Sequence, residues 1–201
     1  MALAEASSEF QALADRVAIE DLLYTYCRAI DRLDFELFKS VYHTDATDEH
    51  PPFAGLAHDV GERIFKFLPT HFSLTSHTVT HARIDIGGQR AVGEAYFLAQ
   101  HLLHEDEALL VAFSGEEYAQ RARASGQAGV QHQFIAGGRY IDRFERRGGQ
   151  WKIADRKVLS EWADFGPVSG VVREGPIRQF MRPGFRGSAD PVYLNAAWLA
   201  E

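Results

Sequence analysis

The chain has 201 residues, of which 46% are hydrophobic and 12% aromatic, and its formal net charge is −7. A chain of this length and composition can bury a substantial core, so we expect one globular domain that needs no disulfide or metal for stability. The 21 basic residues form no continuous stripe, and with the negative net charge they argue against a nucleic-acid partner.

The first part of the sequence is predicted to be helical. One helix spans about residues 9–32, a second begins at Asp34 as its N-cap and ends near Tyr42, and a third covers about 57–68 before Pro69. A short strand is expected from about residue 44, closed by the Pro51–Pro52 pair.

Two long β-hairpins are predicted after these helices. Residues 76–86 and 90–104 flank the turn Gly87–Gly88, and residues 133–145 and 151–162 flank a second glycine turn. Helices followed by long antiparallel strands predict an α+β fold in which the helices pack on one face of a curved sheet.

The segments outside these elements divide the chain into an N-terminal tail (1–9), a domain (10–165) and a C-terminal extension (166–201). Residues 116–129 are interpreted as an inserted loop with room for one short helix, either over a pocket mouth or mobile in solvent. The extension carries Phe180, Phe185, Tyr193 and Trp198, more large apolar side chains than a disordered tail normally holds. We expect it to wrap this subunit or a neighbour.

Cys27 is the single cysteine, and it falls on the apolar stripe of the first helix, which favours a core thiol over a nucleophile. No apolar run has transmembrane length, and the acidic N-terminus lacks the basic start of a signal peptide. The sequence therefore predicts a cytoplasmic protein without a membrane partner.

Asp31 is the most informative residue of the sequence. It continues the apolar stripe of the first helix, which consists of Ile19, Leu22, Leu23, Tyr26, Cys27 and Ile30. Burying an unpaired carboxylate costs several kcal/mol, and the partners that the sequence offers are His71, His77, His81, His101 and His104. The alternative is that Asp31 ends the helix as a cap or pairs with Arg28 or Arg32.

A metal site is not expected. His43, Asp45, Asp48 and His50 lie close together in sequence, but their spacing matches no standard ligand motif. The chain also lacks a phosphate-binding glycine loop and a Gly-x-Ser-x-Gly motif, which argues against nucleotide chemistry and acyl transfer. We therefore expect no cofactor.

Four local strings resemble the SnoaL-like branch of the NTF2-like superfamily, over about residues 10–165. They are residues 26–35, 76–81, 91–96 and 137–145, the last followed by Trp151-Lys-Ile-Ala. The resemblance implies a cone-shaped α+β barrel. It also implies a comparison with the cofactor-independent dehydratases of that superfamily, of the scytalone and bile-acid kinds, whose pockets use Tyr, Asp, His, and Asn or Arg.

This resemblance implies catalytic roles for five residues. Asp31 corresponds to the Asp that orients a catalytic His, and His77 corresponds to that His. His101 matches a second His, Tyr26 a Tyr that faces the same cavity as Asp31, and Arg139 the Asn or Arg position.

Four further residues are expected to contact substrate. His50 lies where scytalone dehydratase has a substrate-contacting Tyr, and Tyr42, Tyr96 and Phe53 are expected to join it in the binding site.

The chemistry of these side chains is consistent with such roles. An imidazole that titrates near neutral pH can remove and return protons, and an inward carboxylate fixes its tautomer. The alternative for His77 is a strand residue bonded to a backbone carbonyl. His101 alternates with Phe97, which predicts an inward side chain. Arg139 either stabilises negative charge in the cavity or forms a surface cross-strand ion pair.

We hypothesise a cofactor-independent lyase that acts on a hydrophobic hydroxylated aromatic substrate, with loss of water or of formaldehyde, as in deformylation of a lignin-derived diarylpropane diol. Two other hypotheses are a non-catalytic small-molecule-binding module and the small subunit of a ring-hydroxylating dioxygenase. Strands such as residues 96–103 carry apolar side chains on both faces, so we expect a homo-oligomer, a trimer by resemblance.

Overall fold

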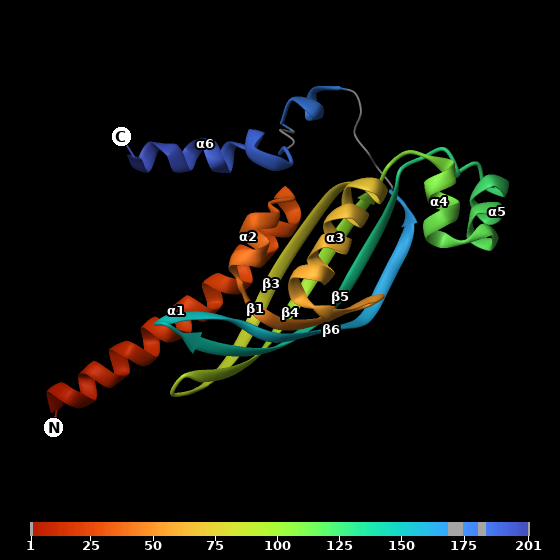
Figure 1. Cartoon of the computed structure of the whole chain (residues 1–201). Helices are drawn as coiled ribbons and strands as arrows, with labels where there is room; N and C mark the ends of the chain where they lie inside the picture. The colour runs from red at the N-terminus through yellow and green to blue at the C-terminus, as the bar shows by residue number, and fades with distance from the viewer. Residues whose placement is uncertain (1, 169–174, 181–183, 201) are drawn as a thin grey trace.

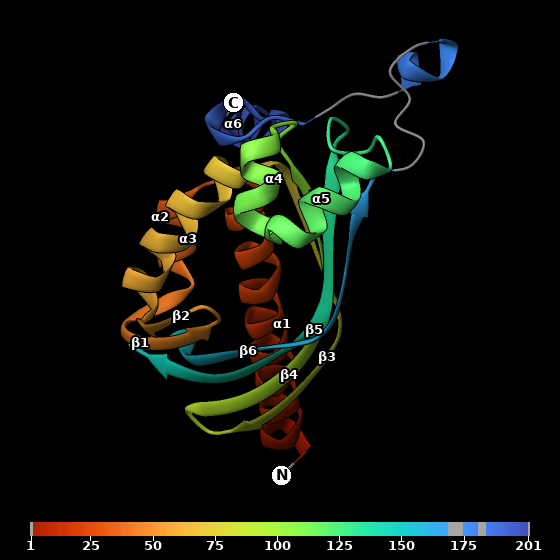
Figure 2. The same cartoon turned by 90° about the vertical axis from the view of Figure 1, so that its right-hand side faces the viewer.

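The computed structural model describes residues 2–168, 175–180 and 184–200. Six strands form one sheet in the order β2-β1-β6-β5-β4-β3. Neighbouring strands are antiparallel except for β1 and β6, which are parallel. The strands are β1 (Tyr42–His50), β2 (Phe53–Leu56), β3 (Phe72–Gly87), β4 (Arg90–Leu103), β5 (His132–Arg147) and β6 (Gln150–Pro167). The sheet is strongly curved and does not close into a barrel (Figure 2), so the predicted α+β fold is confirmed.

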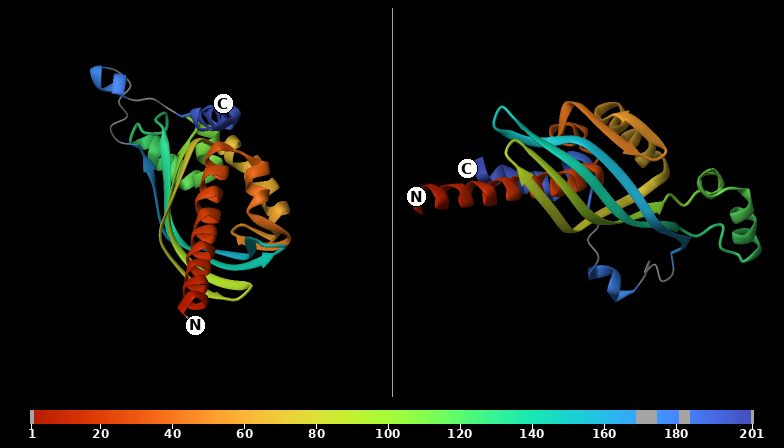
Figure 3. Two further views of the ribbon diagram at one scale, coloured as in Figure 1. Left: turned by 90° about the vertical axis from the view of Figure 1, so that its left-hand side faces the viewer. Right: turned by 90° about the horizontal axis from the view of Figure 1, so that it is seen from below.

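The helices gather on the concave side and at the ends of this sheet (Figure 1). They are α1 (Ala2–Arg32), α2 (Phe35–Ser40), α3 (Ala57–His71), α4 (Glu107–Ser114), α5 (Glu116–Ala124) and α6 (Pro191–Ala197). The N-terminal part of α1 projects beyond the sheet (Figure 3). None of the helices among the described residues is both long and apolar enough to cross a membrane.

The predicted helix ends are partly confirmed. The Asp34 side chain caps α2 by accepting a hydrogen bond from the Leu37 amide at 2.9 Å, as expected. Helix α1 begins at Ala2 rather than near residue 9, because the alanine-rich start of the chain has high helix propensity. Helix α3 continues past Pro69 to His71, and Thr70 donates its hydroxyl to the Lys66 carbonyl at 2.8 Å in this last turn.

Residues 116–129 hold one short helix, α5, as the sequence allowed. Helix α4 precedes this segment and was not predicted. Asp106 caps α4 by accepting from the Leu109 amide at 3.0 Å, and Leu110 is buried. An N-cap before an apolar run is the signal that would have indicated α4.

The two hairpins fix which residues point inward. Their turns contain Gly88, Gly148 and Gly149, whose φ angles of 64°, 59° and 85° lie in the left-handed region that glycine adopts without strain. On β4 the buried positions alternate through Ala95, Phe97, Ala99, His101 and Leu103, and the positions between them face outward or are half-buried. The inward side of this strand, with His101, therefore forms part of the interior.

The C-terminal extension lies partly outside the described residues, at 169–174, 181–183 and 201. Residues 184–193 contact the end of α1, where the Tyr193 ring packs against Arg28 and its hydroxyl bonds Asp34. Phe180 and Trp198 are 84% and 71% exposed in the single chain, so the packing that we expected for these two side chains is not found within it.

Candidate active site

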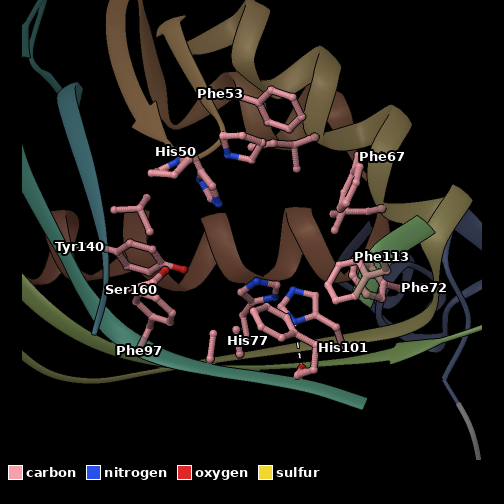
Figure 4. A pocket seen from close by; sticks show the side chains of 18 residues that line it. His50, Phe53, Phe67, Phe72, His77, Phe97, His101, Phe113, Tyr140 and Ser160 are labelled. Atoms are coloured by element: carbon pink, nitrogen blue, oxygen red, sulfur yellow. Dashed lines mark hydrogen bonds between the residues drawn. The ribbon is translucent and has the colours of Figure 1, made fainter. Parts of the chain in front are cut away.

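A cavity of about 290 Å³ lies between α3 and the concave face of the sheet. Its wall includes six phenylalanines together with Tyr140, Pro51 and Pro52. The polar side chains on the wall are His50, His77, His101 and Ser160, and no Asp, Glu, Lys or Arg of the described chain lines it. Figure 4 shows His77 and His101 on one side of the cavity and His50 on the opposite side. Such a cavity favours a mainly apolar, aromatic and uncharged ligand.

Asp31 and His77 form a hydrogen-bonded pair at this cavity. The Asp31 Oδ1 atom lies 2.7 Å from Nδ1 of His77. Because a carboxylate can only accept, Nδ1 carries the proton and donates it, which leaves Nε2 with a lone pair. His77 lines the cavity, whereas Asp31 lies behind it and lines a groove on the outer side of α1. The predicted contact between Asp31 and His77 is confirmed.

A second hydrogen bond fixes this pair to the backbone. The His77 amide donates to Asp31 Oδ2 at 2.8 Å, so both carboxylate oxygens are bonded to one residue. Strand β3 is an edge of the sheet, and Asp31 satisfies one of its amides. The alternative pairing of Asp31 with Arg32 is not found, since Arg32 is 3.6 Å from the Asp190 carboxylate.

His101 stands beside His77 in the cavity wall, as the alternation of β4 predicted. The two rings meet edge to face, with centroids 5.3 Å apart. The Nδ1 atom of His101 lies 3.4 Å from the Phe134 carbonyl, a long contact that favours the proton on Nδ1. Burial, and then the neighbouring His77, lowers the pKa of His101 to about 3. His101 is therefore a neutral hydrogen-bonding group.

His50 and Phe53 also line the cavity, at the turn between β1 and β2. His50 Nδ1 is buried and has no hydrogen-bond partner among the described residues. Burial, and then the charge of Arg156, lowers the pKa of His50 to about 3. A buried imidazole nitrogen without a partner can bind a polar group of a ligand.

Tyr26 does not line the cavity, and Asp31 lies behind His77, so the expectation that Tyr26 and Asp31 face the same cavity is wrong. Residues five apart on a helix are separated by about 140° around its axis, and the two side chains point in different directions. The Tyr26 ring lies 4.3 Å from the Arg156 guanidinium and packs edge-on against Tyr140 at 5.6 Å. Burial raises its pKa well above the usual value, so the phenol stays neutral.

Tyr42 is likewise excluded from the cavity wall, contrary to expectation. Its hydroxyl donates to Asp48 Oδ2 at 3.0 Å in the buried core. Arg156 in the same region is fully buried and bonds Asp142 through two contacts of 2.8 and 2.7 Å. Tyr26, Tyr42, Asp48, Asp142 and Arg156 thus form one buried polar cluster, and none of these residues lines the cavity.

Arg139 and Tyr96 lie on the outer face of the sheet, which corrects two further predictions. Arg139 donates to Glu94 and Glu161 at 2.6 Å each, so the surface ion pair is the alternative that holds. Tyr96 is its neighbour on β4 and is 47% exposed. Because side chains alternate, Tyr140 and Phe97 point inward and the residues before them point outward.

The acidic and histidine side chains near β1 do not converge. His43 bonds the Glu145 carbonyl at 2.9 Å, Asp45 pairs with Arg147 at 2.6 Å, and Asp48 bonds Tyr42. Across the described residues, no group of three or more His, Cys, Asp or Glu side chains is placed to hold a metal ion.

Several cavity residues were not predicted from the sequence. Phe113 comes from α4, which the sequence analysis did not identify, and Ser160 comes from β6. Phe67 and Phe72 flank the end of α3, where the helix was expected to stop earlier. Alternation and helical spacing can predict that these side chains point inward. They cannot predict that side chains from different elements meet around one cavity.

Comparison with known proteins places this fold and cavity in a family. The SnoaL-like domain family matches residues 11–157, so the chain belongs to that family, within the NTF2-like superfamily. A comparison with curated protein sequences gives no significant match.

Three solved structures illustrate the similarity of fold. LinA, whose relatives are named hexachlorocyclohexane dehydrochlorinases, shares 20% identity at a TM-score of 0.63, over 84% of this chain and 99% of that one. A candidate scytalone dehydratase from Novosphingobium aromaticivorans shares 19% at 0.59, over 82% and 97%. A candidate aromatic ring hydroxylase from the same organism shares 18% at 0.57, over 78% and 94%. At these identities the likeness concerns the fold alone.

Proposed function

We propose that this chain is a cofactor-independent lyase that eliminates a leaving group from a neutral, hydroxylated aromatic substrate. The observation that carries the proposal is the 2.7 Å contact between Asp31 and His77, with the free nitrogen of His77 at an apolar cavity. An imidazole held in one tautomer by a carboxylate is a suitable general base. The names of two structural neighbours, a dehydrochlorinase and a candidate dehydratase, both describe eliminations.

The dehydration step assigns a role to each cavity histidine. His77 Nε2 removes a proton from carbon, a carbon–carbon double bond forms, and the neighbouring carbon–oxygen bond breaks. The departing hydroxide takes the proton back from His77 and leaves as water. His101, neutral and 5.3 Å from His77 between ring centroids, positions the departing hydroxyl by accepting its hydrogen bond at Nε2, and His50 binds a distal hydroxyl.

Loss of formaldehyde follows a related route. His77 removes the proton of a hydroxymethyl group, and the bond between this group and the adjacent carbon breaks to release formaldehyde. The electron pair forms a carbon–carbon double bond while a neighbouring hydroxyl leaves, and His77 returns the proton to give water. For a diarylpropane diol, the products are a stilbene, formaldehyde and water. The aromatic wall of the cavity supports a substrate with aryl groups.

The experiment that tests this proposal uses the purified full-length chain without added metal or nucleotide. Diarylpropane diols and polycyclic alcohols are incubated with the native protein, His77→Gln and Asp31→Asn, and alkene and formaldehyde are quantified. We expect product with the native protein and at least a ~100-fold loss with His77→Gln, the minimum typical of a lost general base. Unchanged turnover in His77→Gln would exclude the mechanism.

A non-catalytic binding module is the second candidate. It would have the same cavity, but it would not require a carboxylate bonded to a cavity histidine. Saturable binding of several substrates with no product from any of them would favour it. The small subunit of a dioxygenase would instead co-purify with a larger iron–sulfur partner, so a stable assembly of this chain alone would argue against that function.

We also propose that the chain acts as a homo-oligomer. The outer face of the sheet exposes Val92, Tyr96, Leu98 and Trp162, each between 45% and 54%. Large apolar side chains exposed on one face of a sheet are often covered in an assembly. A trimer is expected from light scattering of the full-length protein, and a monodisperse monomer would exclude it.

A further inference from the structure

The two residues of the catalytic pair come from elements that are far apart in sequence. Asp31 lies in the last turn of α1, and His77 lies in the edge strand β3. Their two hydrogen bonds, of 2.7 and 2.8 Å, require that α1 and β3 keep a fixed relative position. An edge strand has neighbours on one side only, so other contacts must hold its free side.

One side of this arrangement is held by residues 184–193, which we name the C-terminal strap. The strap bonds residues on both sides of Asp31. Arg32 donates to the Phe185 carbonyl at 3.2 Å and pairs with Asp190 at 3.6 Å. Tyr193 donates its hydroxyl to Asp34 at 2.9 Å. The guanidinium of Arg28 lies 4.9 Å from the centre of the Tyr193 ring.

The same strap also bonds the strand that carries His77. Arg186 donates from Nη1 to the carbonyl of Phe72 at 2.6 Å, at the start of β3. The strap therefore links the end of α1 to the beginning of β3 and spans the two elements that hold the pair. Its charge also lies near the site, because Arg186 interacts electrostatically with Asp31.

Hydrogen bonds within the strap join its two ends. Asp190 is 7% exposed, and its carboxylate accepts from the amides of Phe185 and Val192 at 2.9 and 3.0 Å. Gly184 packs so closely that a Cβ atom there would lie 3.1 Å from the Asp190 carboxylate and 3.3 Å from Arg32. Asp190 thus joins the two ends of the strap and Arg32 at one point.

We propose that the C-terminal strap positions Asp31 against His77, with Arg186 and Asp190 as its positioning residues. The strap lies beyond residues 11–157 that match the family, so this role belongs to the extension of this chain. None of its residues lines the cavity, so it acts through Asp31 and not on substrate. The catalytic consequence rests on the proposed function, whereas the structural consequence does not.

Amide hydrogen exchange tests the structural consequence directly. The His77 amide donates to Asp31, so its protection reports the position of the carboxylate. The Val192 amide donates to Asp190 and reports whether the strap is closed. The Tyr140 amide lies in a central strand and reports global unfolding. The variant is the full-length double substitution Arg186→Gln with Asp190→Ala.

We expect exchange at Val192 and His77 to accelerate about tenfold or more, as a lost hydrogen bond predicts, with Tyr140 unchanged. The matched control is Arg121→Gln, which breaks an exposed pair with Glu117 on α5 and should leave all three amides unchanged. Faster exchange at Val192 with native exchange at His77 would overturn the proposal. If Tyr140 also exchanges faster, Tyr193→Phe, which removes the hydroxyl that bonds Asp34 and leaves Asp190 and Arg186 in place, gives the same comparison.

Kinetics then separate this proposal from the proposed function. With a substrate that the native protein turns over, the double variant should lower kcat about tenfold and leave KM nearly unchanged, because the cavity wall is intact. If no lyase activity exists, the proposed function fails while the exchange experiment still decides the role of the strap. A normal kcat together with unprotected His77 would show that the strap does not serve catalysis.

Discussion

Asp142 and Asp31 are two of the buried carboxylates that bond a nitrogen side chain, and their surroundings differ. Asp142 and Arg156 are 2% and 0% exposed, and the guanidinium lies 4.3 Å from the ring centres of both Tyr26 and Tyr140. Asp31 bonds His77, whose second ring nitrogen remains available at a cavity. Burial and charge alone therefore do not indicate a reaction site. The distinguishing feature is a free lone pair beside a space that a ligand can occupy.

The largest expected effect comes from breaking the fully buried pair of Asp142 and Arg156. Arg156→Met leaves the Asp142 carboxylate buried without a partner, so we expect a loss of about 3–5 kcal/mol in the free energy of unfolding, measured in urea. The double variant Asp142→Leu with Arg156→Met should recover much of this loss, since no unpaired charge remains. A change below about 1 kcal/mol in the single variant would contradict the structural role of this pair.

Breaking the pair of Asp31 and His77 at the cavity should reduce turnover much more than stability. His77→Gln removes the free basic nitrogen, so turnover should fall at least ~100-fold while the free energy of unfolding changes far less than in Arg156→Met. Steady-state kinetics and urea unfolding on the same preparation measure both quantities. His81→Gln, at an exposed position on the same strand, is the control and should keep native turnover. A large loss of stability without loss of turnover would reverse the comparison.

The difference between these pairs also explains what the sequence could predict. Helical spacing showed that Asp31 continues an apolar stripe, and alternation with Phe97 showed that His101 points inward. Both signals depend only on the regular periodicity of one helix or one strand, so the folded structure keeps the side-chain directions that they predict. Glycine turns fixed the two hairpins in the same way. The order of helices and strands was therefore sufficient to predict the fold.

The pairing of Asp142 with Arg156 could not be predicted, because a bulge interrupts the alternation. On β6 the buried positions change from Trp151 and Ile153 to Arg156 and Val158, and the strand register shifts between Arg143 and Phe144. A single extra residue moves the following side chains to the other face.

The buried His101 should lower the free energy of unfolding as the pH falls. Burial lowers the pKa of His101 in the folded protein to about 3, against 6.5 for an unperturbed histidine, so between these values the unfolded chain binds the extra proton. Stability from this residue is complete above about pH 6.5 and falls as the pH decreases. From pH 7 to 5 we expect a loss of about 2 kcal/mol, which His101→Phe should lack. Equal pH dependence in both proteins, measured by urea unfolding, would contradict this assignment.

The smallest effect is expected at Arg139, which has charged partners but no access to the cavity. Its guanidinium is bonded to Glu94 and Glu161 on the outer face of the sheet, whereas the cavity wall beside it is formed by Tyr140. Arg139→Gln should therefore change kcat and KM by less than about twofold, as for other surface substitutions away from a site. The same kinetic assay that detects the loss in His77→Gln measures this. A tenfold or greater fall in kcat would mean that the guanidinium leaves its two carboxylates and acts on the substrate, and the distinction between the inner and outer faces of β5 would then fail.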